Sequence, residues 1–263
     1  MTGESGDVGA RGALGDASAT TDGDQPRVAV FRPDDDRLAD AVDLLESLDA
    51  TPVPDPMLAV EATGASPRDD ADYVVVTSKT GVELAADADW TPGGATLCAI
   101  GEATAAACRD AGWTVDLVPD EYTSAGLVAA LEDDVDGACV EVARSDHGSA
   151  VLTDGLSDAG AYVHETTLYE LVRPEGAGGS VALAAAGDLD AALFSSSLTV
   201  TNWLDAAAER GVEADALAGL NEAVVGAIGP PTRETAERHG VDVDVVPADA
   251  DFEQLARDVR DEL

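Results

Sequence analysis

The stretch Ala99-Ile-Gly-Glu-Ala-Thr104 recurs 128 residues later as Ala227-Ile-Gly-Pro-Pro-Thr232, and this internal repeat decides the fold. Further matches follow in the same order: Ala111-Gly112 with His239-Gly240, Val118-Pro119 with Val246-Pro247, and residues 123–131 with residues 251–259. Upstream, Val74–Ser78 matches Ala192–Ser196, with a longer connection to the second glycine. Several matches in one order indicate two similar lobes.

Each copy reads as a strand, a Ser/Thr turn, a helix, a strand, an Ile-Gly turn and a further helix. Short strands that alternate with helices predict an α/β fold of parallel sheets flanked by helices. Strands are expected at 27–31, 51–53, 58–61, 73–77, 95–100, 114–118, 138–143 and 162–169. Helices are expected at 37–48, 103–111 and 150–159, and from about residues 79 and 123.

The two lobes are not expected to divide the chain at its midpoint. The strand at 27–31 has no partner nearby and suits the second copy, while Arg173–Gly179 has the composition of a linker back to it. We therefore predict a discontinuous lobe, residues 26–34 plus 175–263, and an inserted lobe, residues 35–172, joined by a two-stranded connection. Residues 1–25 lack periodicity and are expected to form a disordered extension.

The charge of the chain is strongly negative. With 14 Lys and Arg against 53 Asp and Glu, the net charge is −39, and Lys79 is the only lysine. Such a polyanion repels phosphate backbones, which excludes nucleic acid as a partner. The acidic residues are scattered along the chain, which favours a halophilic protein of a high-salt cytoplasm, with a monomer as the expected state.

Other common classes of site find little support in the sequence. Cys98, Cys108 and Cys139 form no C-x-x-C pair, so we expect reduced thiols and no disulfide framework. The three histidines are dispersed, and no metal site is expected. A chain with neither a bilayer-length apolar run nor a signal peptide is expected to be soluble and cytoplasmic, without a membrane partner. The glycine-rich fingerprints of dinucleotide and nucleoside triphosphate binding are also missing, and no cofactor is predicted.

The Ile-Gly turns carry the chemistry that the sequence offers. Ligands of parallel α/β sheets bind at the carboxyl ends of strands, where helix N-termini attract anions. Gly101 and Gly229 allow close approach of the backbone, and Thr104 and Thr232 add hydroxyl donors one turn later. The neighbouring turns Thr77-Ser78-Lys79 and Ser195-Ser196-Ser197 are the same device. Facing lobes would place these donors around an interlobe cleft suited to a polyanion, although helix capping alone also explains them.

Two further side chains have both a functional and a structural interpretation. Lys79 is either a carboxylate partner or catalytic amine, or a solvent-facing residue of a first helical turn. Tyr169 stands at the end of the inserted lobe, where its hydroxyl could donate a proton into the cleft, or where its ring packs at a hinge.

Taken together, these motifs resemble the uroporphyrinogen-III synthase family from Val28 to about Val259. The segments that carry the resemblance are Val74–Val82, Ala99–Thr104, Val142–Ser145, Thr167–Tyr169, Leu193–Ser197 and Ala227–Thr232. The resemblance implies a lyase (hydro-lyase) without cofactor or metal, whose active site lies between two lobes. Its substrate would be hydroxymethylbilane, handed over from hydroxymethylbilane synthase, and its reaction the closure of that linear tetrapyrrole with inversion of the terminal ring and loss of water.

The resemblance also implies roles for single residues. Tyr169 matches the family's cleft tyrosine, the candidate for assisting departure of the hydroxyl. Polar or backbone contacts to the substrate carboxylates would come from Thr77, Ser78, Lys79, Gly101, Thr104, Arg144, Ser195, Ser196, Ser197, Gly229 and Thr232. The family commonly has a glycine after the arginine that corresponds to Arg144, whereas this chain has Ser145.

Two competing interpretations remain. A non-catalytic two-lobed protein that binds a tetrapyrrole or another polycarboxylate needs the same cleft as the synthase. A dehydrogenase or methyltransferase would need the glycine-rich fingerprint that the sequence lacks.

Overall fold

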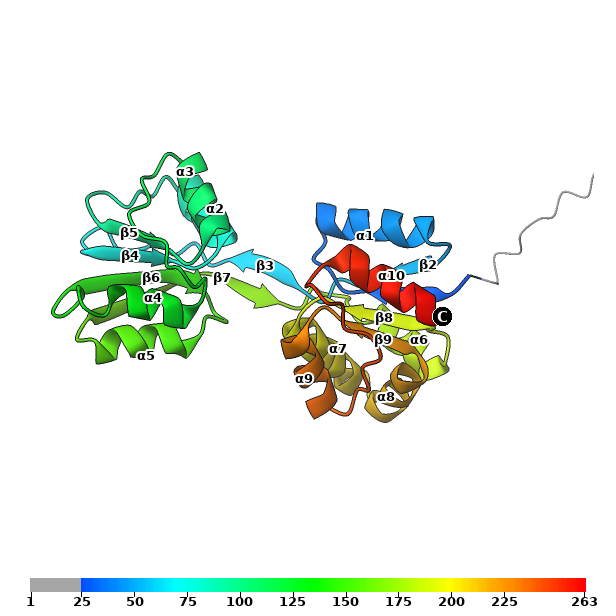
Figure 1. The fold of residues 1–263 in the computed structure, drawn as a ribbon. Helices are drawn as coiled ribbons and strands as arrows, with labels where there is room; N and C mark the ends of the chain where they lie inside the picture. Colours follow the sequence, from blue (N-terminus) through cyan, green and yellow to red (C-terminus); the bar gives the residue numbers. More distant parts are fainter. Residues whose placement is uncertain (1–24) are drawn as a thin grey trace, which may run out of the picture.

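The computed structural model describes residues 25–263 as two α/β lobes joined by two chain segments (Figure 1). The predicted extension at residues 1–25 therefore lies, apart from Gln25, outside the described residues.

The discontinuous lobe is built on an all-parallel sheet of order β2-β1-β8-β9. Its strands are β1 (Arg27–Val30), β2 (Thr51–Pro54), β8 (Ala191–Phe194) and β9 (Val224–Ala227). Its helices are α1 (Asp36–Ser47), α6 (Gly179–Ala186), α7 (Ser197–Glu209), α8 (Glu213–Glu222), α9 (Pro230–Arg238) and α10 (Phe252–Glu262). Helices α1 and α10 cover one face of the sheet, and α6 to α9 cover the other (Figure 1).

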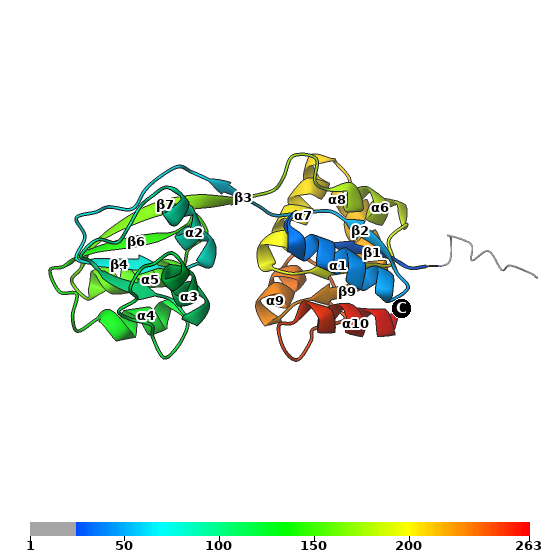
Figure 2. The ribbon, with the colours of Figure 1, turned by 90° about the horizontal axis from the view of Figure 1, so that it is seen from above.

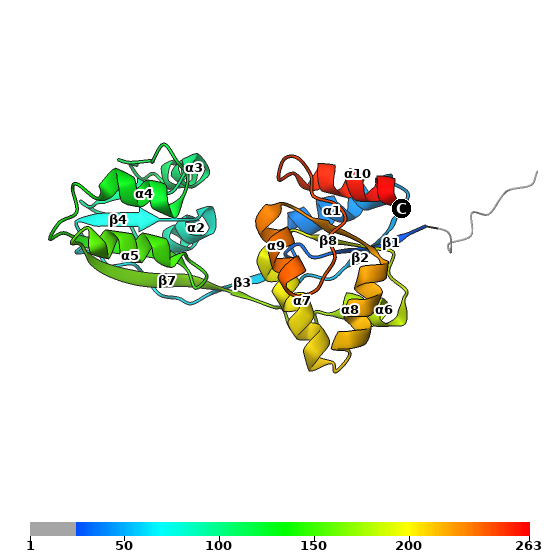
Figure 3. The same ribbon diagram turned by 60° about the horizontal axis from the view of Figure 1, so that its bottom comes forward.

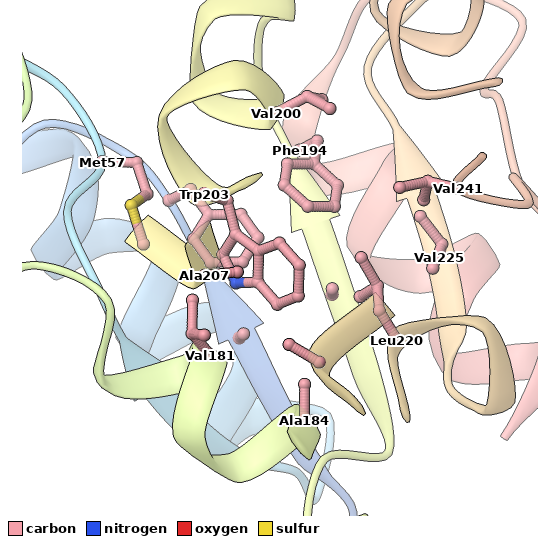
Figure 4. Close-up of a cluster of buried hydrophobic side chains, with 14 of the residues drawn as sticks. Met57, Val181, Ala184, Phe194, Val200, Trp203, Ala207, Leu220, Val225 and Val241 are labelled. Carbon is pink, nitrogen blue, oxygen red and sulfur yellow. The ribbon is translucent and has the colours of Figure 1, made fainter. Parts of the chain in front are cut away.

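The larger core of this lobe lies under α6, α7 and α8 and is centred on Trp203 (Figure 4). Phe194 stacks on Phe31 with ring centroids 4.6 Å apart and meets Trp203 edge-on at 6.5 Å. The indole N–H of the fully buried Trp203 donates to Ser180 Oγ at 3.0 Å, so this aromatic core leaves no indole donor unsatisfied.

The inserted lobe is a five-stranded sheet of order β3-β7-β6-β4-β5, in which only β3 is antiparallel to its neighbour. Its strands are β3 (Ala59–Ala62), β4 (Tyr73–Val76), β5 (Thr96–Ala99), β6 (Cys139–Ser145) and β7 (Tyr162–Val172). Helices α2 (Lys79–Asp87) and α3 (Glu102–Asp110) cover one face, and α4 (Ser124–Leu131) and α5 (Ala150–Asp158) the other (Figure 1; Figure 2 shows the lobe from above).

The structure corrects the predicted boundary between the lobes at residues 34 and 35. Helix α1 and strand β2, expected in the inserted lobe, belong to the discontinuous lobe, because β2 pairs with β1. Leu38 and Leu45 of α1 also pack against Val28 and Val30 in one core. The chain therefore leaves the discontinuous lobe after β2 and returns along β7.

The internal repeat extends to individual hydrogen bonds. Leu97 N–H donates to Asp116 Oδ2 at 2.9 Å, and 128 residues later Val225 N–H donates to Asp244 Oδ2 at 2.8 Å. The predicted strand at 114–118 is wrong as a full strand: it contributes a single parallel bridge, Cys98 to Leu117, with the equivalent bridge Gly226 to Val245 in the other lobe. The Asp116 carboxylate takes the N–H that a longer ladder would use.

The carboxyl ends of the parallel strands in both lobes point toward the other lobe. Strand β1 runs from the N-terminal side of the molecule toward the inserted lobe, and β4 runs toward the discontinuous lobe (Figure 3). Because the neighbours of β1 and β4 are parallel to them, all the turns at the strand ends lie on the inner edges of the lobes.

Candidate functional site

The strand register brings the predicted turns together in pairs. Val76 lies opposite Ala99 at the ends of β4 and β5, so the Thr77-Ser78-Lys79 turn lies beside the Ile100-Gly101 turn. Phe194 lies opposite Ala227 in the same way, which places Ser195–Ser197 beside Gly229. The hydroxyl of Ser197 donates to the carbonyl of Pro231 at 2.9 Å and joins the second pair directly.

Gly101 and Gly229 are the N-cap residues of α3 and α9. In the described chain, no side chain of either cap residue accepts a hydrogen bond from the helix start, because both are glycines. Backbone N–H groups at these helix starts are therefore left for another acceptor. The two starts differ in donor number, however. Pro230 and Pro231 occupy the first two positions of α9 and have no N–H, whereas α3 begins with Glu102 and Ala103, which both have one. The donor-rich start is that of α3.

Thr104 and Thr232 lie in the first turns of these helices and are 5% and 3% exposed. Both are thus held within their lobes, behind the glycine turns. A direct role for their hydroxyls as carboxylate donors stays a prediction.

The serine turns are engaged in capping. Ser78 Oγ accepts from Gly81 N–H at 3.0 Å, and Ser196 forms a reciprocal capping box with Thr199 at 3.2 and 3.3 Å. The capping alternative therefore accounts for both hydroxyls. Thr77 and Ser195, the residues before the caps, are half-buried, each at the inner edge of its own lobe.

Tyr169 lies on β7 at the level of Ser145 and is 7% exposed. Its hydroxyl donates to Ser78 Oγ at 3.0 Å, which links the predicted proton donor to the cap of α2. The ring belongs to the apolar core under α2 and α3, as the packing interpretation of Tyr169 predicts. A packed ring is compatible with a hydroxyl at the inner edge of the lobe. The structure brings Tyr169 and Ser78 into contact, and their role in a substrate site stays a prediction.

The two cations of the predicted set have partners within the protein. Lys79 Nζ lies 3.3 Å from Glu83 on the exposed side of α2. The buried guanidinium of Arg144 donates to the carbonyl of Ser149 at 2.6 Å and forms an ion pair with Glu165. Contact between Arg144 and substrate would require exchange of these partners.

Gly148 explains how Arg144 is accommodated next to Ser145. A Cβ at position 148 would lie 2.2 Å from Arg144 Cδ, so the Arg144 side chain needs a glycine at this position. Gly148 lies three residues beyond Ser145, the position where the family commonly has a glycine.

The sequence analysis missed Tyr122. Its ring packs against Gly101: a Cβ added there would lie 3.0 Å from Tyr122 Cγ. The side chain is nevertheless 62% exposed. An aromatic residue directly before the N-cap Thr123, in a repeat whose other copy has Ala250, was the available signal.

Other features of the described chain lie apart from the strand ends. A cavity of about 500 Å³ lies at the amino end of β5, between residues 91–96 and 112–116, and contains none of the predicted site residues. No helix within residues 25–263 has the length and apolar character needed to cross a membrane. The same part of the chain holds no group of three or more His, Cys, Asp or Glu side chains placed to bind a metal ion.

Known proteins match both the sequence and the fold. The profile of the family described as Uroporphyrinogen-III synthase HemD matches residues 39–257. A protein of Methanothermobacter thermautotrophicus, provisionally named a uroporphyrinogen-III synthase, is 33% identical over 230 residues, which cover 81% of this chain and 90% of the relative.

Solved structures agree in fold at low sequence identity. A mutant uroporphyrinogen III synthase from the extremely thermophilic bacterium Thermus thermophilus has a TM-score of 0.61 and 19% identity, covering 90% of this chain and 97% of the other. The uroporphyrinogen-III synthetase of Helicobacter pylori has a TM-score of 0.60 and 11% identity, covering 91% and 100%. With the family profile spanning most of the described residues, the chain belongs to the uroporphyrinogen-III synthase family.

Proposed function

We propose that the chain is a uroporphyrinogen-III synthase that closes hydroxymethylbilane into a macrocycle with inversion of the terminal pyrrole ring. The observation that carries the proposal is the family match over residues 39–257, in a fold whose strand-end turns lie on facing inner edges. The reaction breaks the bond from the terminal carbon to its hydroxyl, which leaves as water, and the terminal carbon bonds to the already substituted α-carbon of the last pyrrole to give a spirocyclic intermediate. The old bond from that α-carbon to its methylene bridge then breaks, and the bridge carbon bonds to the other α-carbon of the same ring, which inverts the ring. Loss of the proton from this second α-carbon restores aromaticity.

Tyr169 is the proposed donor of the proton that converts the departing hydroxyl to water. Its hydroxyl is already oriented by Ser78 at 3.0 Å, and the β4–β5 register places the start of α3 beside the turn that carries Ser78. The backbone donors at Gly101 would hold substrate carboxylates near this hydroxyl. Much of the catalysis would then be positioning, because the open-chain substrate can cyclise unaided to the wrong isomer.

The cellular setting belongs to the same proposal. The enzyme would act as a monomer in a high-salt cytoplasm, in the biosynthesis of tetrapyrroles, and would receive its substrate from hydroxymethylbilane synthase. The net charge of −39 supports the high-salt setting, since such self-repulsion is tolerated only when it is screened.

An isomer assay at high salt tests the function. Hydroxymethylbilane generated in place is incubated with and without the protein, and the oxidised products are separated into type I and type III uroporphyrin. Type III product in proportion to the protein supports the synthase. Type I product alone, from protein shown to be folded, contradicts it and favours the tetrapyrrole-binding alternative, which binding of uroporphyrin III without turnover would test.

A further inference from the structure

We infer that Tyr122 is a stacking platform that positions one pyrrole ring of the substrate against the start of α3. This inference rests on the proposed function, and it makes the two Ile-Gly turns of the repeat unequal.

Tyr122 lies in the loop that leads into α4. The residue follows the segment that pairs with β5 through Leu117 and precedes the N-cap of α4, so it lies at the inner edge of the sheet. Among the large apolar side chains exposed in residues 25–263, Tyr122 and Val151, in the first turn of α5, occupy this edge, and Val60 on β3 lies beyond it, opposite Leu171. Tyr162, at the start of β7, is exposed at the opposite end.

The ring of Tyr122 packs against Gly101. Because Tyr122 Cγ lies 3.0 Å from the position of an added Cβ, the ring forms one wall of the turn that carries the free N–H groups of α3. A carboxylate held at those N–H groups brings its attached pyrrole next to this wall. An exposed aromatic face is suited to stack on a flat, electron-rich ring.

The other copy of the repeat has no aromatic residue at the corresponding position. There, position 250 is alanine, and in the described chain a Cβ at Gly229 meets nothing closer than Pro231 Cδ at 4.0 Å. Pro230 and Pro231 also remove two N–H donors from α9. The donor-rich start and the aromatic wall therefore occur on the same side of the molecule, at Gly101.

Carboxylates oppose this arrangement and limit it, because Asp120 and Glu121 directly precede Tyr122 and are exposed. Glu102 lies in the first turn of α3, where its charge would repel a substrate carboxylate, but it forms an ion pair with Arg109. Stacking on Tyr122 supplies an attraction that does not depend on the charge of the ligand.

The test compares Tyr122→Ala, Tyr122→Phe and the control Tyr162→Ala, which removes a 70% exposed ring far from the inner edge. At high salt, we expect Tyr122→Ala to raise KM for hydroxymethylbilane about tenfold, to change kcat less, and to increase the share of type I product. The Phe variant keeps the ring and should stay within about twofold of the parent, as should Tyr162→Ala. The dissociation constant for uroporphyrin III, measured by fluorescence without turnover, should follow KM.

A double-mutant cycle tests the contact itself. Gly101→Ala pushes a methyl group against the ring and should raise KM in the parent, but much less in the Tyr122→Ala background. Additive effects, or an unchanged KM and dissociation constant in folded Tyr122→Ala, would overturn the platform while leaving the synthase intact. A parent protein that makes no type III isomer would instead refute the proposed function.

Discussion

At the scale of single residues, the hydroxyl of Tyr169 is the proposed proton donor. Replacement by Phe keeps the buried ring in its core but removes the donor to Ser78 Oγ. We expect turnover to fall by about a hundredfold, at the low end of what a positioned proton donor contributes, with KM changed less. Initial rates of type III formation measure this effect. Unchanged turnover would remove the acid role, and Tyr162→Phe, far from the inner edge, is the control.

The three thiols should differ in reactivity. Burial raises the pKa of Cys98 to about 12 and that of Cys108 to about 11, so neither forms a thiolate near neutral pH in the folded protein. Cys139 is exposed at the start of β6. We expect one thiol per folded chain to react with a disulfide reagent at pH 8, and three after unfolding. Loss of the fast phase in Cys139→Ser assigns it; fast reaction of two or three thiols would contradict the buried positions.

At the scale of elements, Asp55 ties the outgoing chain after β2 to the returning chain at α6. Its buried carboxylate accepts from the N–H groups of Gly178 and Ser180, both at 2.8 Å, and from the Ser180 hydroxyl. Asp55→Ala leaves these donors unsatisfied and should lower the free energy of unfolding by at least about 2 kcal/mol. Chemical denaturation measures the loss, and a change below about 0.5 kcal/mol would contradict this anchoring role.

The matched control is another aspartate at a helix start, Asp35 at the N-cap of α1, which is exposed and should cost only about 1 kcal/mol when changed to Ala. Its hydrogen bonds to Arg37 hold the pKa of Asp35 below its usual value. A lowered folded-state pKa stabilises the protein above the unfolded pKa, near 3.8, and this contribution is lost as the pH falls through the folded value. The difference between the parent and Asp35→Ala should therefore persist at pH 6 and shrink below pH 3.8.

The order of the elements could be predicted from the sequence because each one has a local signal. Asp35, Ser78 and Thr123 cap helices that begin close to the predicted starts at residues 37, 79 and 123, and the repeat located both Ile-Gly turns. The assignment of α1 and β2 to a lobe could not be predicted, since it depends on pairing between β1 and β2 rather than on either segment alone. The contact between Tyr169 and Ser78, 91 residues apart, was also hidden, as was the engagement of Arg144 by Glu165.

At the scale of the whole molecule, the proposed function requires the two inner edges to hold one polyanion although the protein itself is strongly acidic. The attraction is local: uncapped helix starts and an aromatic face lie at the edges, and the Glu102 carboxylate at the same edge is paired with Arg109. Long-range repulsion between protein and substrate then falls with added salt, whereas short contacts to backbone N–H groups persist. Substrate binding should consequently need salt for more than stability alone.

The fold itself should depend on salt for the same electrostatic reason. With a net charge of −39, mutual repulsion favours expansion of the chain. Salt shortens the range of this repulsion, because the Debye length falls from about 10 Å at 0.1 M to about 3 Å at 1 M. We expect the thermal midpoint to rise steeply between about 0.1 and 2 M KCl, and the helical circular-dichroism signal to be lost at the lowest salt. Glycerol, which does not screen charge, is the control and should not replace KCl at low ionic strength. A fold that persists unchanged at low salt would reject self-repulsion as the dominant destabilising term, and the acidic surface would then require a different explanation from adaptation to a salt-rich solvent.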